Sequence, residues 1–249
     1  MSPVNALKTT FAIVQVLARK GGASVSSIAQ EIDTPKSTVH DHLSSLEELE
    51  YAVNDGNAYR LSSRWVEIGT RIRDRNPVFN VAKNQVDELA DRTGEHVSLF
   101  IEEQGMATML YTAKGENAID IIQFDGMRFS PHSNAAGKAM LAYMNWNKVD
   151  EILSSRGMTQ MTENTITDRN ELIKELERIR ERGYSLENQE YIEGVRAVAM
   201  PIDTPTTEPA SSLTIYGPAS RLEGTRFTEE IPDLLRRATN IIEVTLTHG

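Results

Sequence analysis

The amino-terminal part of the chain carries an apolar spacing that leaves few ways to fold. A helical stripe is predicted by four residues at spacings of four, three and three: Leu7, Phe11, Val14 and Leu17. The same spacing recurs further along: Val39, Leu43, Leu46 and Leu49. Between the two stripes, Ser24 can cap a short helix that carries Ile28, Ala29 and Ile32. We therefore predict three short helices in this region.

Local signals set the ends of these helices and add a hairpin. Residues 20–22 (KGG) put a cation and then glycines at the end of the first helix. Thr34 and Pro35 predict the start of the third helix, with Thr as its cap and Pro at its first position. Asp55-Gly56, inside residues 51–61, is typical of a hairpin turn. Three helices followed by a hairpin match a winged helix-turn-helix.

The third helix has a polar face of the kind that DNA-reading helices present. Its candidates for DNA contact are Lys36, Ser37, Thr38, His40, Asp41 and His42, and Tyr59 and Arg60 add a wing contact at the end of the hairpin. Ser37 and Thr38, near the amino end, suit phosphates. The histidines and Asp41 lie further along, where side chains reach base edges.

A protein-docking module is the alternative for this domain, because any surface helix has a polar face. Residues 1–76 hold nine basic and nine acidic residues, so their formal charge is zero. However, Glu47, Glu48 and Glu50 cluster at the far end of the third helix and leave its beginning neutral to basic. We therefore expect double-stranded DNA as the partner.

Composition excludes several classes of protein. The chain has 249 residues and no cysteine, which excludes disulfides, thiol nucleophiles, cysteine zinc sites and iron–sulfur clusters. No apolar run approaches the ~20 residues that a membrane-spanning helix needs. The first ten residues lack the charged-then-apolar pattern of a signal peptide. We expect a cytoplasmic protein with no membrane partner.

The net charge of −10 falls wholly on the residues after 76. The chain has 18 Arg and only 8 Lys. An acid excess with few lysines resembles proteins from a high-salt, halophilic cytoplasm. An ordinary acidic protein fits the same composition, and both interpretations stay open.

The chain is predicted to divide near Asn76-Pro77. A fourth helix over residues 64–75 carries Trp65, Ile68 and Ile72, and Pro77 ends it. We predict a winged helix-turn-helix over residues 1–63, a linker helix over 64–77 and a second domain over 78–249.

The second domain is predicted to mix helices and strands around one sheet, as α+β or α/β. The predicted helices cover residues 79–93, 135–144, 169–182 and 228 onward. The predicted strands cover residues 96–101, 108–111, 119–124, 184–188, 195–202 and 211–216, with a loop over 203–209.

Small residues at the start of the helix near residue 135 predict a ligand site. Ala135, Ala136 and Gly137 allow backbone N–H groups to approach a carboxylate or phosphate closely. Tight packing of the helix on the sheet is the alternative. A P-loop is excluded, because His132 and Ala139 stand where it needs Gly and Ser or Thr.

The sequence gives little support for an enzyme. Ser133 stands beside His132, but no third member and no Gly-x-Ser-x-Gly turn accompany them. The 5 histidines lack metal-binding spacing. We predict no catalytic residues, no metal and no cofactor.

Four segments, in order along the chain, resemble the IclR family of transcription regulators. They are residues 35–40 (PKSTVH), 136–139 (AGKA), 194–201 (GVRAVAMP) and 213–218 (LTIYGP). The resemblance runs over nearly the whole chain. It implies a winged helix-turn-helix, a linker helix and a GAF/profilin-like effector-binding domain. It also implies a homodimer or dimer of dimers, and an effector among organic, aromatic or sugar-derived acids.

The resemblance further implies which residues line the effector pocket. By motif position these are Ala135, Ala136, Glu187, Ala197, Thr214 and Tyr216, with Gly137 at the helix start. Ala197 stands where the family often has Cys, and Tyr216 where it often has a small Ser, so a very small carboxylate is a poor fit. Asp41 stands where many relatives have Arg.

Two further expectations concern side chains near this pocket. Thr214 and Tyr216 alternate along one strand and should point to the same side of the sheet. Glu190 and Arg196 flank Gly194 and are expected to pair with each other or to cap backbone groups.

Taken together, these features predict a sequence-specific DNA-binding regulator whose operator binding responds to a small metabolite. A ligand-free docking or architectural module is the alternative, and an enzyme is the remaining class. A pocket with an apolar floor beside Ala136 would favour the regulator, whereas a filled interior would favour the docking module.

Overall fold

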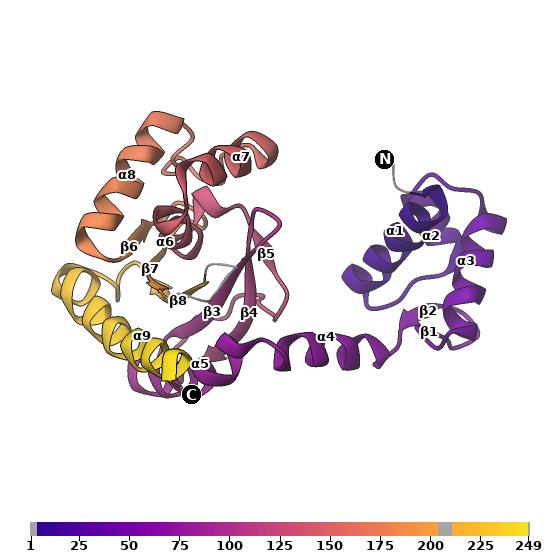
Figure 1. Ribbon diagram of the computed structural model, residues 1–249. Coiled ribbons are helices and arrows are strands. Elements are labelled where there is room, and N and C mark those ends of the chain that lie inside the picture. Colours follow the sequence, from indigo (N-terminus) through magenta and orange to yellow (C-terminus); the bar gives the residue numbers. More distant parts are fainter. Residues whose placement is uncertain (1–3, 204–210, 249) are drawn as a thin grey trace. The chain divides into compact units, whose positions relative to one another are not determined.

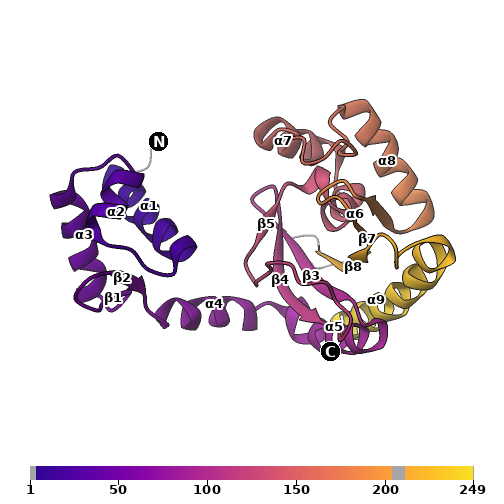
Figure 2. The same ribbon diagram turned by 180° about the vertical axis from the view of Figure 1, so that it is seen from behind.

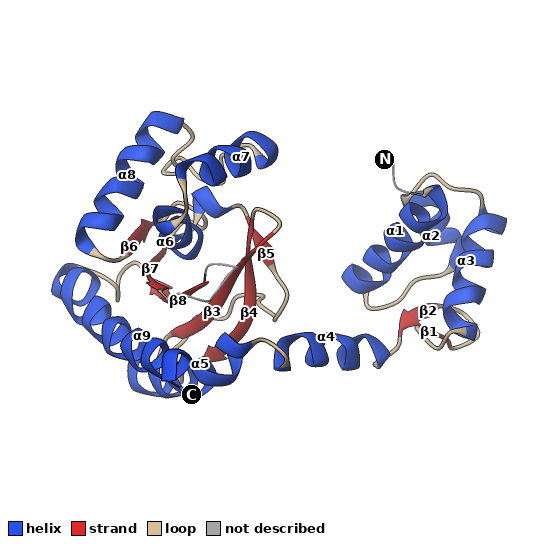
Figure 3. Ribbon diagram, in the orientation of Figure 1, coloured by secondary structure: helices blue, strands red, loops and turns tan. Residues whose placement is uncertain are grey.

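The computed structural model describes residues 4–203 and 211–248, and the chain forms two compact units, residues 1–72 and 73–249. The loop predicted over 203–209 lies, apart from Asp203, outside the described residues. Figures 1 and 3 show the elements of both units. Those of the first unit are α1 (Asn5–Lys20), α2 (Val25–Glu31), α3 (Lys36–Glu48), β1 (Ala52–Asn54) and β2 (Tyr59–Leu61), followed by α4 (Arg64–Asp74), which runs into the second unit.

The first unit has the predicted winged helix-turn-helix fold. Its three helices and hairpin share one apolar core, which includes Ile13, Val16, Leu17, Ile28, Val39, Leu43, Leu46, Ala52 and Tyr59. Ser24 caps α2 by accepting the N–H of Ser27, and Gly21 ends α1 with a φ of 70°. The predicted hairpin is confirmed: β1 and β2 pair antiparallel around a turn that contains Asp55 and Gly56.

Details of the three predicted helices are wrong. Leu7 and Phe11 are more than half exposed, because the core uses the carboxyl-terminal half of α1 through Ile13, Val16 and Leu17. Leu49 is exposed, because it lies just beyond the last helical residue of α3. Thr34 does not cap α3; its hydroxyl donates to the carbonyl of Ile32.

The predicted fourth helix is α4, and none of its residues is buried. Its first turn is fixed to the hairpin, because the Trp65 indole N–H donates to the carbonyl of Tyr51 over 3.0 Å and the two rings are in contact. Ile68 and Ile72, predicted to form an apolar stripe, are exposed.

The second unit is an α+β domain built on one sheet. Its remaining elements are α5 (Pro77–Thr93), β3 (His96–Glu103), β4 (Met106–Lys114), β5 (Arg128–Phe129), a 3-10 turn (Pro131–Ser133), α6 (Ala135–Tyr143), α7 (Trp146–Arg156), α8 (Arg169–Arg182), β6 (Ser185–Asn188), β7 (Val195–Ile202), β8 (Ser211–Pro218), a π-helical turn (Arg226–Glu230) and α9 (Ile231–His248). The six strands run in the order β5-β4-β3-β8-β7-β6, and all neighbours are antiparallel.

Helices cover both faces of this sheet, as the views from the two sides show (Figures 1 and 2). One face packs against α5 and α9 through a large apolar core that includes Leu99, Ile215 and Leu235. The opposite face packs against α6, whose outer side is covered by α7 and α8. Because side chains alternate along a strand, the four long strands β3, β4, β7 and β8 contribute both to the main core and to the α6 side.

Some elements of the second unit differ from the prediction. Residues 119–124 form no strand; β5 (Arg128–Phe129) pairs with β4 instead. The last helix, predicted from residue 228 onward, begins earlier, because helical structure already starts at Gly224 and the Thr228 hydroxyl donates to the carbonyl of Gly224 instead of capping a helix start. The helix α7 was not predicted. The other predicted helices and strands are present, within a few residues of their expected ends.

Across residues 4–203 and 211–248, no helix combines the length and the apolar character needed to cross a bilayer.

Candidate functional site

The exposed face of α3 carries most of the residues predicted to contact DNA. Lys36, Ser37, His40 and Asp41 are exposed, and Thr38 is half-buried. No side chain caps the amino end of α3, so its first backbone N–H groups are available to an anion. This end of the helix therefore presents hydroxyls, N–H groups and one ammonium.

Two of the predicted DNA contacts point elsewhere. Tyr59 is only 6% exposed: its ring fills the core of the first unit, and its backbone pairs with Ala23. His42 turns toward α1, where its Nδ1 lies 2.8 Å from the hydroxyl of Thr10. Both side chains therefore make contacts within the first unit, although their positions in the sequence predict them on the DNA-contacting surface.

Charge in the first unit is partly neutralised by internal pairs. Arg19 and Lys20 both pair with Glu31, and Arg64 pairs with Glu50. Among the described residues, Lys36 and Arg60 take part in no salt bridge. Lys36 on α3 and Arg60 on β2 are therefore the cations of this unit best placed to meet phosphates.

A pocket of about 340 Å³ lies in the second unit, between the sheet and the amino end of α6. Ala135, Ala136, Glu187, Ala197, Thr214 and Tyr216, all carried over from the resemblance, line it. The rest of the lining is mostly apolar: Phe100, Met109, Ile121, Ile122, Gln123, Met127, Phe129, Asn134, Tyr191, Ile192 and Val195.

Strand register explains how the floor of this pocket forms. On β7, Ala197 pairs with Glu187 of β6 on one side and with Tyr216 of β8 on the other. Side chains at paired positions share one face of a sheet. The methyl group of Ala197 therefore leaves open space between the side chains of Glu187 and Tyr216. Thr214 and Tyr216 both line the pocket, as expected for side chains on the same face of β8.

Glu187 is the one carboxyl group among the described pocket residues. Its Oε1 accepts the backbone N–H groups of Glu190 and Tyr191 at 3.0 and 3.2 Å. Burial raises the pKa of Glu187 to about 7, although these N–H groups and the charge of Lys138 act against the rise. Glu187 can therefore exist in either protonation state near neutral pH.

Tyr216 anchors a segment that forms one wall of the pocket. Its hydroxyl donates to Oε1 of Gln123 and lies 3.0 Å from the hydroxyl of Ser98. Its ring stacks on His96, and Nε2 of His96 lies 2.7 Å from the carbonyl oxygen of Ile119. Residues 119–124, predicted as a strand, are instead held across the pocket by these two contacts.

Two residues of the Gly-Lys helix start serve packing rather than the pocket. A Cβ on Gly137 would lie 2.3 Å from the Pro131 backbone, and Gly137 does not line the pocket, contrary to the prediction. The Lys138 ammonium is buried against Glu190, at 2.5 Å from Oε1. Glu190 therefore does not pair with Arg196, whose guanidinium donates to Asn188 and to backbone carbonyls.

The possible catalytic pair makes only structural contacts. Nε2 of His132 lies 3.0 Å from the carbonyl oxygen of Thr159, and the Ser133 hydroxyl donates to the carbonyl of Ser130. Burial lowers the pKa of His132. In the described parts of the chain, no group of three or more His, Asp or Glu side chains is arranged to hold a metal ion.

Family comparisons agree with both units. The model described as bacterial transcriptional regulator IclR C-terminal matches residues 70–244, and the IclR helix-turn-helix domain matches residues 6–56. The chain belongs to the IclR family. It is a DNA-binding transcription regulator with a helix-turn-helix domain and an α+β carboxyl-terminal domain.

Individual IclR-family relatives cover nearly the whole chain. A probable HTH-type transcriptional regulator, ArcR of Halobacterium salinarum, is 27% identical over 238 residues, which are 94% of this chain and 90% of the relative. The crystal structure of Thermotoga maritima IclR has a TM-score of 0.81 and 29% identity, and covers 97% of this chain and 98% of its own.

A third relative carries a ligand. It is an IclR homologue of Microbacterium hydrocarbonoxydans complexed with 4-hydroxybenzoate, with a TM-score of 0.80, 21% identity, and coverage of 98% of this chain and 100% of its own. It shares the fold with the present IclR-family chain.

Sequence reasoning missed most of the pocket of this IclR-family protein. The aromatic and methionine side chains at its far end carry no local motif, since Phe100, Met109 and Phe129 look like ordinary strand residues. Gln123 and Ile121 lie within residues 119–124, which the sequence predicts to be a strand. Only pairing across the sheet brings these residues to one cavity.

Proposed function

We propose that this IclR-family regulator binds a small organic effector in the pocket beside α6, and that the effector alters its affinity for operator DNA. In this proposal residues 1–63 bind DNA, α4 within residues 64–77 links the two parts, and residues 78–249 bind the effector. A ligand that binds one of two conformations more tightly shifts their populations, and this coupling is reciprocal.

The pocket itself is the observation that carries the proposal. A docking or architectural module needs no cavity, whereas about 340 Å³ of space adjoins Ala136 and has an apolar floor. This volume lies near the lower end of the range for small-molecule sites, roughly 300–1,000 Å³. The bound 4-hydroxybenzoate of the Microbacterium homologue supports an effector role for this domain.

The proposed DNA contacts are those on the free face of α3 and on the wing. Ser37, Thr38 and the amino end of α3 would meet phosphates together with Lys36 and Arg60. His40 and Asp41 lie one turn further along and would face base edges. Asp41 can accept a hydrogen bond from cytosine N4 but repels phosphate, which would favour sequence-dependent binding over general attraction.

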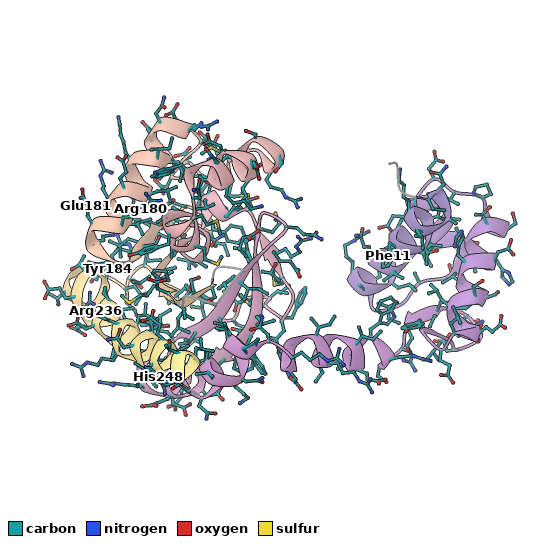
Figure 4. All side chains as sticks on the ribbon, viewed as in Figure 1. Phe11, Arg180, Glu181, Tyr184, Arg236 and His248 are labelled. Carbon is teal, nitrogen blue, oxygen red and sulfur yellow. The ribbon has the colours of Figure 1, made fainter. Side chains whose placement is uncertain are left out.

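We propose that the protein acts as a homodimer or a dimer of dimers. Exposed apolar side chains support this: Val4 just before α1, Leu7 and Phe11 on α1 (Figure 4 labels Phe11), and Ile68 and Ile72, four residues apart on α4. Apolar side chains at such helical spacings are usually covered by a partner. A two-fold dimer would bind two half-sites about one helical turn of DNA apart.

In this proposal the chain binds its effector without converting it, and it works in the cytoplasm. The backbone contacts of His132 and Ser133 support the first point, because the Ser133 hydroxyl donates to the carbonyl of Ser130 and not to His132.

A thermal-shift screen tests the proposed function. Organic, aromatic, sugar and amino acids would be compared on the wild type and on Ala197→Leu, which fills the pocket floor. An effector stabilises the folded protein by mass action, so the Tm should rise with ligand concentration in the wild type only. Equal shifts in both proteins, or no shift with any compound, would contradict an effector role for this pocket.

A further inference from the structure

The charges around the pocket are unusual for a site that would hold only an acid. Among the described residues that line it, Glu187 is ionisable as an acid and none is Lys, Arg or His. Lys138, whose charge acts on Glu187, is buried and paired with Glu190. A ligand carboxylate would therefore meet no cationic side chain in this pocket.

One end of the pocket can nevertheless hold a single carboxylate. The N–H groups of Ala135 and Ala136, in the first turn of α6, have no partner within the helix. Thr214 lines the pocket, is 3% exposed, and its hydroxyl has no hydrogen-bond partner among the described residues. Two backbone donors and a buried hydroxyl without a partner are thus available among the residues that line one pocket, and all three can donate to an anion.

Glu187 lies beside this anion site. Its neighbour across the strand pair is Ala197, and Ala197 packs in the same apolar cluster as Ala135. Oε1 of Glu187 is occupied by backbone N–H groups, whereas Oε2 has no hydrogen-bond partner in the described chain. A positive group next to the carboxylate of a ligand could bind Oε2 of Glu187.

The other end of the pocket is apolar and aromatic. The Phe129 ring meets Phe100 and Tyr191 edge-on, with centroids 5.6 and 5.1 Å apart, and Met109 and Met127 complete this end. Flexible thioethers and ring edges suit an aromatic or long aliphatic group. The pocket thus has an acceptor for a cation, donors for an anion and an apolar end.

We propose that the effector is an amino acid with a large apolar side chain. Its carboxylate would bind the amino end of α6 and Thr214, its ammonium would bind Glu187, and its side chain would lie among Phe100, Phe129 and Tyr191. This rests on the proposed function and adds the chemical class of the effector. Sugar acids fit poorly, because Gln123 and Tyr216 bind each other and Asn134 caps α6, which leaves few groups for hydroxyls.

Calorimetric titration of the full-length protein with matched compounds tests the proposal. The probes are L-phenylalanine, 3-phenylpropionate, which lacks the amine, and 2-phenylethylamine, which lacks the carboxylate. L-phenylalanine should bind at least about tenfold more tightly than either analogue, since each loses a hydrogen bond to a charged group.

Two variants test the contact to the ligand's ammonium and the contact to its carboxylate separately. Glu187→Gln should weaken L-phenylalanine binding about tenfold and leave 3-phenylpropionate unweakened, since only the ammonium contact is lost. Thr214→Val should weaken both acids and leave 2-phenylethylamine unchanged. Glu193→Gln, an exposed carboxyl that does not line the pocket, is the matched control and should change nothing.

Three outcomes would overturn the proposal: 3-phenylpropionate binding as tightly as L-phenylalanine, equal losses for L-phenylalanine and 3-phenylpropionate in Glu187→Gln, or no binding of L-phenylalanine, L-methionine and L-leucine at millimolar concentration. If one of these outcomes occurs and another compound still stabilises the wild type but not Ala197→Leu, the proposed function stands and only the proposed class of effector is wrong. Failure of the proposed function is distinct, because then no compound distinguishes those two proteins.

Discussion

The ammonium of Lys138 lies 2.5 and 2.6 Å from the two carboxylate oxygens of Glu190 and also donates to the carbonyl of Leu186. Both charged side chains are at least nine-tenths buried. The pair joins α6 to the turn between β6 and β7, and the same turn supplies the N–H groups that hold Glu187. The geometry of the pocket therefore depends on a buried charge pair that does not line it.

Removing one member of this pair should be strongly destabilising. Lys138→Met leaves Glu190 buried without a counter-charge, and we expect a loss of about 3–5 kcal/mol in the free energy of unfolding of the second unit. Urea unfolding followed by the fluorescence of Trp146, in a Trp65→Phe background, measures it. Lys148→Met is the control, because Lys148 is exposed and lies 3.9 Å from Glu151. Equal losses in the two variants would contradict this role.

Glu187 should make stability depend on pH. Its pKa is about 7 in the folded protein and 4.5 as a free side chain, so protonation favours the folded state. Its contribution is fully present below pH 4.5 and is lost as the pH rises to about 7, by on the order of 3 kcal/mol. Glu187→Gln should therefore gain stability relative to the wild type across this window, as measured by urea unfolding. A difference that is constant with pH would contradict the raised pKa.

The amino end of α3 should carry phosphate contacts. The double substitution Ser37→Ala/Thr38→Ala should weaken binding to a DNA fragment selected from a random library by about tenfold, since two hydrogen bonds to a charged group are lost. Gel-shift titration measures the affinity, and circular dichroism checks the fold. The control is Ser154→Ala/Ser155→Ala, two exposed serines on α7. Unchanged DNA affinity in the α3 variant would exclude this helix as the reader.

Asp41 should limit the general attraction of α3 to DNA. Its carboxylate is 83% exposed on the proposed reading face, so Asp41→Arg replaces a repulsive charge with an attractive one. We expect tighter binding to unrelated DNA and a slope of log affinity against log salt that is steeper by about one. Titrations at several salt concentrations give this slope. An unchanged slope would place Asp41 away from the phosphates.

Local signals were sufficient for much of the fold. The glycine stop after α1, the Ser24 cap of α2 and the Asp55-Gly56 turn all act where the sequence predicts, because each depends on a few adjacent residues. The pocket residues carried over by resemblance also line one cavity, Gly137 excepted.

The errors share a physical cause, which is that burial depends on distant partners. Residues 119–124 have strand-like composition, but Arg128–Phe129 takes the edge of β4, and Gln123 and Ile119 are held by Tyr216 and His96. Leu7 and Phe11 have helical apolar spacing, yet nothing within the described chain buries them. Position in the sequence predicts Tyr59 on the surface, but its backbone pairs with Ala23 and its ring lies in the core.

The central claim is that the pocket and the DNA-binding domain are coupled, and operator affinity tests it most directly. Fluorescence anisotropy would follow a labelled operator fragment bound by the wild type and by Ala197→Leu, each with and without the most strongly stabilising compound of the thermal-shift screen. We expect the compound to change the Kd for DNA at least about fivefold in the wild type and to leave it unchanged in Ala197→Leu. A compound that binds the wild-type pocket but leaves the Kd for DNA unchanged would contradict this claim.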